Sequence, residues 1–164
     1  VWRYIKMDNI LQLLEENGRL TAEQLAVMCG RELDEVKAVI KHYEETGVIL
    51  GYTAQIDWDK TEREYVSAII ELKVAPQRDR GFDRVAEKIY NYPEVKSVCL
   101  MSGGFDLLLT LEGKTLKEVA YFVANKLSPL EDVVSTATHF VLKKYKDKGI
   151  IYGAPEIDER GNIL

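Results

Sequence analysis

The sequence lacks the features of an integral membrane protein, a disulfide-stabilised secreted domain or a metal protein. No apolar run in its 164 residues approaches the roughly 18–20 residues that a membrane-spanning helix needs. Residues 1–6 are too short and too polar for a signal peptide, and Met7 is expected to be the natural start. The two cysteines, Cys29 and Cys99, lie far apart without a CxxC motif or a neighbouring histidine. We therefore expect reduced thiols, a cytoplasmic location, no cofactor and no metal site.

Catalytic signatures are also missing. The two histidines, His42 and His139, are isolated in the sequence, and no nucleophile–base pair or metal-ligand spacing accompanies them. A net charge of −5 argues in addition against a generic nucleic-acid binder. The 46% of apolar residues is enough to build a core, so we expect a folded protein of one large or two small domains that is not an enzyme.

Residues 1–52 have the pattern of three short helices. The second helix begins with a capping box, in which Thr21 and Gln24 satisfy two backbone N–H groups, and it closes at Gly30. The third helix stops at Gly47. Two short helices joined by a tight turn predict a helix-turn-helix, with the third helix in the recognition position.

After the helices the pattern changes to strands. Residues 48–52 are β-prone and are expected to form a wing or a linker strand, and residues 53–64 are a polar linker. Four strands and two helices then alternate, with strands expected at 66–74, 95–101, 105–111 and 133–142, and helices at 82–89 and 116–127.

This order is βαββαβ, and the expected fold class is α+β: an N-terminal (winged) helix-turn-helix followed by a ferredoxin-like module over residues 65–146. Both helices of such a module lie on one face of an antiparallel sheet. The other face needs a cover, which we expect to be a partner subunit. Residues 147–164 are polar and are expected to be a loosely ordered tail or an exchange arm.

Four segments in this order resemble the Lrp/AsnC ("feast/famine") family of transcriptional regulators: Asn17-Gly18-Arg19-Leu20-Thr21, the stretch from Glu44 to Tyr52, Gly103-Gly104-Phe105-Asp106-Leu107-Leu108, and Thr136-Ala137-Thr138. The resemblance implies that the N-terminal part binds double-stranded DNA. It also implies that the C-terminal modules pair sheet against sheet into homodimers, which often assemble into octamers. A small effector, usually an amino acid, would bind between dimers and change assembly or DNA affinity.

The best candidate for the effector site is the loop around Gly103-Gly104. Its glycines free the backbone to approach a ligand and offer N–H groups to a carboxylate, while Asp106 could receive an α-ammonium group. The alternative is a plain hairpin turn that Asp106 caps. With the positions that the resemblance adds, the expected effector-binding residues are Met101, Gly103, Gly104, Asp106, Leu116, Thr136, Thr138, His139 and Phe140. Leu116 and Phe140 fit a core or an interface equally well.

The recognition helix departs from the family pattern in its charge. Residues 31–46 carry three Lys/Arg against five Asp/Glu, and residues 1–52 carry six against nine. Carboxylates at Glu32, Asp34 and Glu35 would be repelled by phosphates, which dominate DNA affinity. The expected DNA-facing residues are Arg31, Lys37, Ala38, Lys41 and His42.

Two alternatives to a DNA-binding regulator are considered, and the first follows from these charges. Lys37 and Lys41 can simply pair with carboxylates at helical spacing. The chain would then be a ligand-sensing or hetero-oligomerising member of the family that binds DNA weakly or not at all. The siroheme decarboxylases, which resemble this family, place histidines at a tetrapyrrole site, and two isolated histidines give that activity little support.

Overall fold

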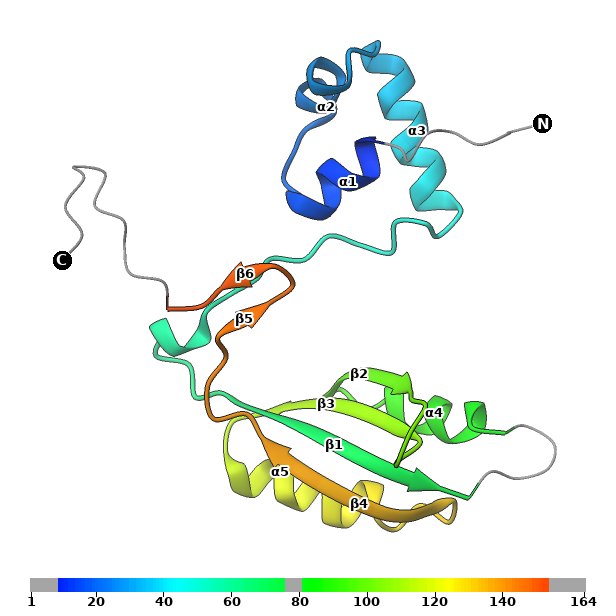
Figure 1. Cartoon of the computed structure of the whole chain (residues 1–164), viewed down its shortest axis with the longest axis vertical. Coiled ribbons are helices and arrows are strands. Elements are labelled where there is room, and N and C mark those ends of the chain that lie inside the picture. The colour runs from blue at the N-terminus through cyan, green and yellow to red at the C-terminus, as the bar shows by residue number, and fades with distance from the viewer. Residues whose placement is uncertain (1–8, 76–80, 154–164) are drawn as a thin grey trace. The chain divides into compact units, whose positions relative to one another are not determined.

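The computed structural model describes residues 9–75 and 81–153. Met7, at the expected start, and most of the expected tail lie outside these ranges. The chain divides after Ile56 into two compact units, a helical one and a mixed α/β one (Figure 1). No helix in the described ranges is long and apolar enough to cross a membrane.

The first unit consists of the three predicted helices: α1 (Asn9–Glu16), α2 (Ala22–Cys29) and α3 (Leu33–Glu45). Ile10, Leu25 and Val36, one from each helix, are fully buried and form the centre of its core. The capping box is present, because Gln24 N donates to Thr21 Oγ1 and Thr21 N donates to Gln24 Oε1. The predicted three-helix arrangement is thus confirmed.

The stretch after α3 is not the strand that its composition predicts. Residues 48–56 contain no β-strand, and Leu50 is 94% exposed. Backbone N–H groups of Val48 and Ile49 donate to Tyr43 O and so close the end of α3. Apolar and β-branched residues favour a strand only where a second strand can pair with them, and this unit offers none. The prediction of a wing or linker strand was wrong for the single chain.

The second unit is a four-stranded antiparallel sheet with two helices. Strands β2 and β4 lie at the edges of the order β2-β3-β1-β4, so β1 pairs with both β3 and β4. This is the expected ferredoxin-like βαββαβ fold. Its elements are β1 (Val66–Val74), α4 (Asp83–Tyr90), β2 (Val95–Leu100), β3 (Leu107–Gly113), α5 (Leu116–Phe122, continued by a π-helix over Val123–Leu127) and β4 (Val133–Phe140).

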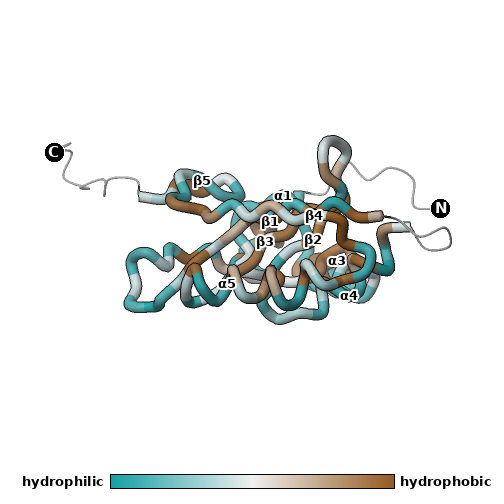
Figure 2. Tube along the Cα trace, turned by 90° about the horizontal axis from the view of Figure 1, so that it is seen from below, coloured by the Kyte–Doolittle hydropathy of each residue, from teal (hydrophilic) through white to brown (hydrophobic). Residues whose placement is uncertain are grey.

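One face of this sheet forms the core of the unit. Ile70 and Leu72 of β1 and Leu109 of β3 are buried beneath α4 and α5, which lie on the same side of the strands (Figure 2). Burying each such side chain contributes roughly 1.5–3 kcal/mol. The helices leave the other face bare. The outward residues of the register on that open face include Ile69, Glu71, Lys73, Ser97, Cys99, Leu108, Thr110, Ser135, Ala137 and His139.

A β-hairpin follows the sheet. Strands β5 (Lys146–Asp147) and β6 (Ile150–Ile151) pair antiparallel, and Tyr152 N donates to Tyr145 O at 2.9 Å. The two residues between the strands, Lys148 and Gly149, have φ values of 43° and 84°. Positive φ at both positions is typical of a tight hairpin turn. Residues 147–153 are therefore ordered, which corrects the expectation of a loosely ordered tail beginning directly after Lys146.

Replacement of a core leucine should destabilise the protein far more than replacement of an exposed one. Leu109→Ala removes a fully buried side chain from the central sheet, and we expect the free energy of unfolding to fall by about 3 kcal/mol. Leu142→Ala is the matched control, because Leu142 is 96% exposed and should cost less than about 0.5 kcal/mol. Urea denaturation at one protein concentration compares them, and equal losses would contradict this core.

Candidate DNA-binding and effector sites

The outward surface of α3 carries the residues expected to face DNA. Lys37, Ala38, Lys41 and His42 are all exposed, on the side of the helix away from buried Val36. Arg31 lies in the turn between α2 and α3. The structure therefore brings the five predicted residues onto one helix and the turn that precedes it.

Each of the three cations in this set is already paired with a carboxylate. Arg31 donates to Glu35 Oε1 through Nη2 at 2.7 Å and through Nε at 3.2 Å. Lys41 Nζ lies 3.6 Å from Glu45 Oε1, at the i,i+4 spacing that the alternative interpretation uses. Exposed pairs of this kind contribute about 0–1 kcal/mol, so DNA phosphates can compete for the lysines.

The partner of Lys37 comes from a different helix. Lys37 Nζ lies 3.8 Å from Glu23 Oε1, in the first turn of α2. The pKa of the Glu23 carboxyl is lowered, first by a hydrogen bond from its own backbone N–H, then by the Thr21 hydroxyl, and least by the charge of Lys37. Glu23 therefore stays ionised beside Lys37 at neutral pH. Helical spacing within α3 could not have indicated this pair.

The residues expected to bind the effector occupy several places in the second unit. Met101, Gly103, Gly104 and Asp106 belong to the β2–β3 loop, and Gly103 has a φ of 147°, which favours glycine. Thr136 and Thr138 pair with Leu72 and Ile70 of β1, so they lie on the helix side of edge strand β4. His139 pairs with Ile69 and faces the open side, where its Nε2 lies 3.4 Å from Glu71 Oε1. Phe140 packs against the core.

Leu116 lies at the other end of the sheet from the β2–β3 loop. It begins α5 just after Gly113, which pairs with Val66 at the start of β1, whereas the backbone N–H of Asp106 donates to Leu72 O near the end of β1. Six strand residues separate those positions, a span of about 20 Å. One chain therefore does not bring Leu116 and Asp106 into a single pocket, and a shared site would need residues from two copies.

Asp106 is part of the fold as well as a candidate ligand residue. Its Oδ2 accepts a hydrogen bond from Val74 N at 2.8 Å, and its carbonyl accepts one from Met101 N at 2.8 Å. The β1–β4 register shifts between Lys73 and Val74, so the carboxylate satisfies a backbone N–H beside a bulge. Among the described residues, Asp106 Oδ1 has no hydrogen bond. One oxygen thus holds the hairpin while the other can meet a ligand.

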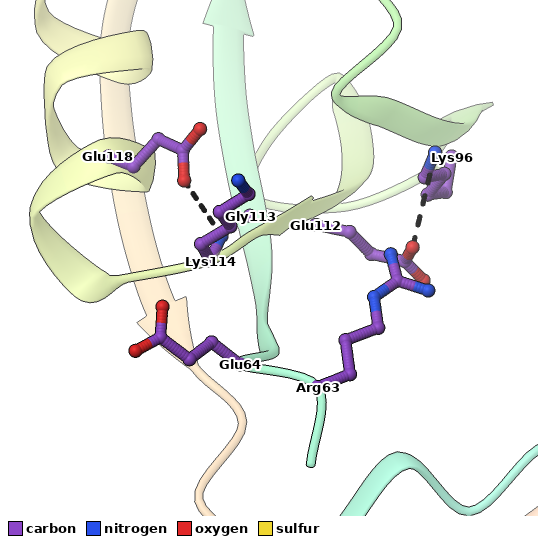
Figure 3. Close-up of a pocket in the computed structure, with 7 residues that line it drawn as sticks. All are labelled: Arg63, Glu64, Lys96, Glu112, Gly113, Lys114 and Glu118. Atoms are coloured by element: carbon purple, nitrogen blue, oxygen red, sulfur yellow. Dashed lines mark hydrogen bonds and ion pairs between the residues drawn. The ribbon is translucent and has the colours of Figure 1, made fainter. Parts of the chain in front are cut away.

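A charged cleft of about 330 Å³ lies elsewhere, beside Gly113 and α5 (Figure 3). Its charged lining residues are Arg63, Glu64, Lys96, Glu112, Lys114 and Glu118. Much of this charge is paired internally, since Lys96 Nζ lies 4.0 Å from Glu112 Oε2 and Glu118 Oε2 accepts from the backbone N–H of Lys114. None of the nine residues expected to bind the effector lines this cleft. Only the folded register brings residues 63–64, 96 and 112–118 together, so no sequence spacing could have indicated it.

Comparison with known proteins assigns the chain to a family. Residues 67–151 match the Lrp/AsnC ligand binding domain. The uncharacterized HTH-type transcriptional regulator YugG of Bacillus subtilis is 47% identical over 94% of both chains. The chain belongs to the Lrp/AsnC family of transcriptional regulators. This confirms the resemblance seen in the sequence.

More distant Lrp/AsnC relatives agree with this assignment. The proline dehydrogenase transcriptional activator of Rhizobium radiobacter is 26% identical over 86% of this chain and 90% of its own. A transcriptional regulator of Neisseria meningitidis, solved as a complex with L-Met, has a TM-score of 0.67 and 26% identity over 89% of this chain and 92% of that one. Because such relatives are regulators, the expectation that the chain is not an enzyme is also confirmed.

Asp106 variants should separate charge from hydrogen bonding in this Lrp/AsnC domain. Asp106→Ala leaves the N–H of buried Val74 without its acceptor, and we expect a loss of about 1–3 kcal/mol in the free energy of unfolding. Asp106→Asn keeps an acceptor oxygen of the same shape and should lose less than half as much. Urea denaturation of both variants measures this, and equal losses would show that the hydrogen bond does not stabilise the hairpin.

Proposed function

We propose that this chain is a DNA-binding transcriptional regulator that responds to an amino acid. The observation that carries the proposal is the joining of a helix-turn-helix unit to a ferredoxin-like unit that matches the Lrp/AsnC ligand binding domain. In the proposed division, residues 1–52 bind DNA, 53–64 link the parts, 65–146 bind the effector and oligomerise, and 147–164 form a C-terminal segment. The proposed location is the cytoplasm.

A homodimer is proposed because one sheet face is left without a cover by the helices of its unit. Ile69 is 37% exposed there, beside the half-buried Leu108 of β3. A second copy can place the same face against it, since a two-fold axis makes a surface complementary to itself. We further propose that such dimers assemble into octamers, and that the effector acts on this assembly.

The proposed effector site combines the β2–β3 loop with Thr136 and Thr138 of β4. Asp106 Oδ1 would accept the α-ammonium group, and the N–H groups around Gly103 and Gly104 would donate to the α-carboxylate. The residues at the other end of the sheet, Leu116 and Phe140, would come from a neighbouring copy. The complex of the Neisseria meningitidis regulator with L-Met supports an amino acid as the ligand class.

Regulation follows from where such a ligand binds. A ligand that contacts two copies binds their assembly more tightly than the separate dimers, so it shifts the population toward the assembly. Assembly fixes the spacing of the helix-turn-helix units, and spacing determines which DNA half-sites can be occupied together.

A second function is favoured by the acidity of the helical unit. Its residues 9–56 carry four Lys/Arg against eight Asp/Glu, and the cations Arg31, Lys37 and Lys41 are all paired. A unit of this charge would gain little from phosphates. The alternative is a ligand-sensing or hetero-oligomerising member of the family that does not hold DNA by itself.

A salt titration on the DNA fragment upstream of the chain's own gene tests the choice between these two functions. If the chain binds DNA, removing the carboxylates that pair with Lys37 and Lys41 should strengthen binding. We expect Glu23→Gln combined with Glu45→Gln to raise DNA affinity severalfold and to steepen the dependence of log K on log [salt] by about 1–2. Fluorescence anisotropy at four salt concentrations measures both quantities.

The control for this test is Glu15→Gln combined with Glu16→Gln, which changes the net charge equally but lies on α1. An equal gain in the control would mean that overall charge, and not release of the lysines, limits binding. Absence of DNA binding by the wild-type chain and by both variants at low salt would favour the second function.

Amino-acid binding should require the negative charge of Asp106. Asp106→Asn keeps an acceptor for Val74 N but turns its amide NH₂ toward the ligand, so the α-ammonium group loses its partner. We expect affinity for the tightest-binding amino acid of a calorimetric panel to fall at least about 10–100-fold. Glu87→Gln, which changes an exposed carboxylate on α4, is the control and should retain affinity. Unchanged affinity of Asp106→Asn would exclude this carboxylate from the site.

A further inference from the structure

The hairpin after the sheet carries a concentrated positive charge in an otherwise acidic protein. Residues 143–148 contain four lysines and one aspartate, a local net charge of +3, while the whole chain has a net charge of −5. In Figure 2 the hydrophilic stretches of this segment lie around β5. The helical unit is acidic, so this basic cluster is separated in the sequence from the expected DNA-binding helix.

Three of these lysines are available to a partner. Lys143, Lys146 and Lys148 are exposed, and in the part of the chain that the structure describes none of them has an ion pair. Lys143 Nζ lies 4.9 Å from the centre of the Tyr145 ring. Only Lys144 is neutralised, through Asp147 Oδ2 at 2.9 Å.

The hairpin also exposes side chains of the kinds that contact phosphates. It is a two-stranded ribbon with a tight Lys148-Gly149 turn, and the exposed ring of Tyr145 lies beside its lysines. Lysine and tyrosine side chains are common donors to phosphate oxygens. The charge thus stands on an ordered element and not on an unstructured tail.

Within its unit, the hairpin begins at the end of the sheet where residues 57–65 lead into β1. Phe140 at the end of β4 pairs with Ala68 near the start of β1, and Val141 N donates to Ser67 O at 2.9 Å. The hairpin therefore leaves the sheet at the end where residues 57–65 arrive from the helical unit. Lys144 lies close enough to residue 65 for its charge to affect the Tyr65 hydroxyl. Burial and then Glu112 raise the pKa of Tyr65, and the charge of Lys144 lowers it slightly.

We propose that the hairpin of residues 143–152 binds the phosphate backbone of DNA through Lys143, Lys146 and Lys148. This inference rests on the proposed DNA-binding function and adds to it a second DNA contact outside the helix-turn-helix. Phosphates are favoured as the occupant because the cations on and before α3 are paired with carboxylates, whereas three hairpin lysines have no ion pair among the described residues and can contact anions.

The test is the salt dependence of DNA binding by the full chain, with the same upstream fragment. Lys143→Gln, Lys146→Gln and Lys148→Gln are combined in one variant. The matched control combines Lys114→Gln, Lys117→Gln and Lys126→Gln, three exposed lysines on or beside α5. Each lost phosphate contact lowers the slope of log K against log [salt] by about 1, so we expect a decrease of about 3 for the hairpin variant and none for the control.

Sedimentation velocity of each variant accompanies the titration. An unchanged assembly with the lower slope is the expected result. A hairpin variant with the wild-type slope overturns the proposal while leaving DNA binding by the helices intact. A smaller assembly, with or without a lower slope, also overturns it, because the lysines would then hold another copy of the chain. A wild-type chain that binds no DNA at about 50 mM salt overturns the proposed function, and this inference with it.

Discussion

Strand β1 is the element on which the second unit depends, because it pairs along its length with both β3 and β4. Its alternation fixes which side chains of all three strands face the helices and which face outward. Ile70 and Leu72 of β1 face the core, whereas Ile69 and Glu71 lie on the face that the helices do not cover. The same packing that stabilises the unit therefore leaves the other face without helices, and this is the face on which a second copy is proposed to pack.

The two units also differ in how their charged side chains are paired. The helical unit holds most of the excess acid and pairs three of its four described cations at 2.7–3.8 Å, whereas the hairpin β5–β6 keeps three lysines without ion pairs among the described residues. Exposed ion pairs are weak, so in the proposed DNA-binding function the pairing of these cations would reduce DNA affinity without abolishing it. Moderate affinity per subunit suits a regulator in which several subunits bind together, because occupancy then depends on assembly.

Much of the fold could be predicted from the sequence, because local rules and the tertiary structure agree there. The Thr21 capping box and the period-two pattern of β1 mark their elements to the residue. Prediction failed where strand formation depends on a pairing partner from elsewhere in the chain. Residues 48–52 have the composition of a strand, but no second strand pairs with them. The strands β5 and β6 are too short for their sequence to show an alternating pattern. The two roles of Asp106 were recognisable as alternatives, but its bond to Val74 N depends on a bulge that no local spacing encodes.

The two ends of β1 carry different proposed tasks. The β2–β3 loop is bonded to its C-terminal end through Leu72 and Val74, while the chain to the helices and the basic hairpin both lie at its N-terminal end. Strand β1 is paired on both sides, and the sheet shows no second arrangement among the described residues through which a ligand at one end could act on the other. Coupling through assembly avoids this difficulty: a ligand between copies changes how many units act together while each unit keeps its own structure.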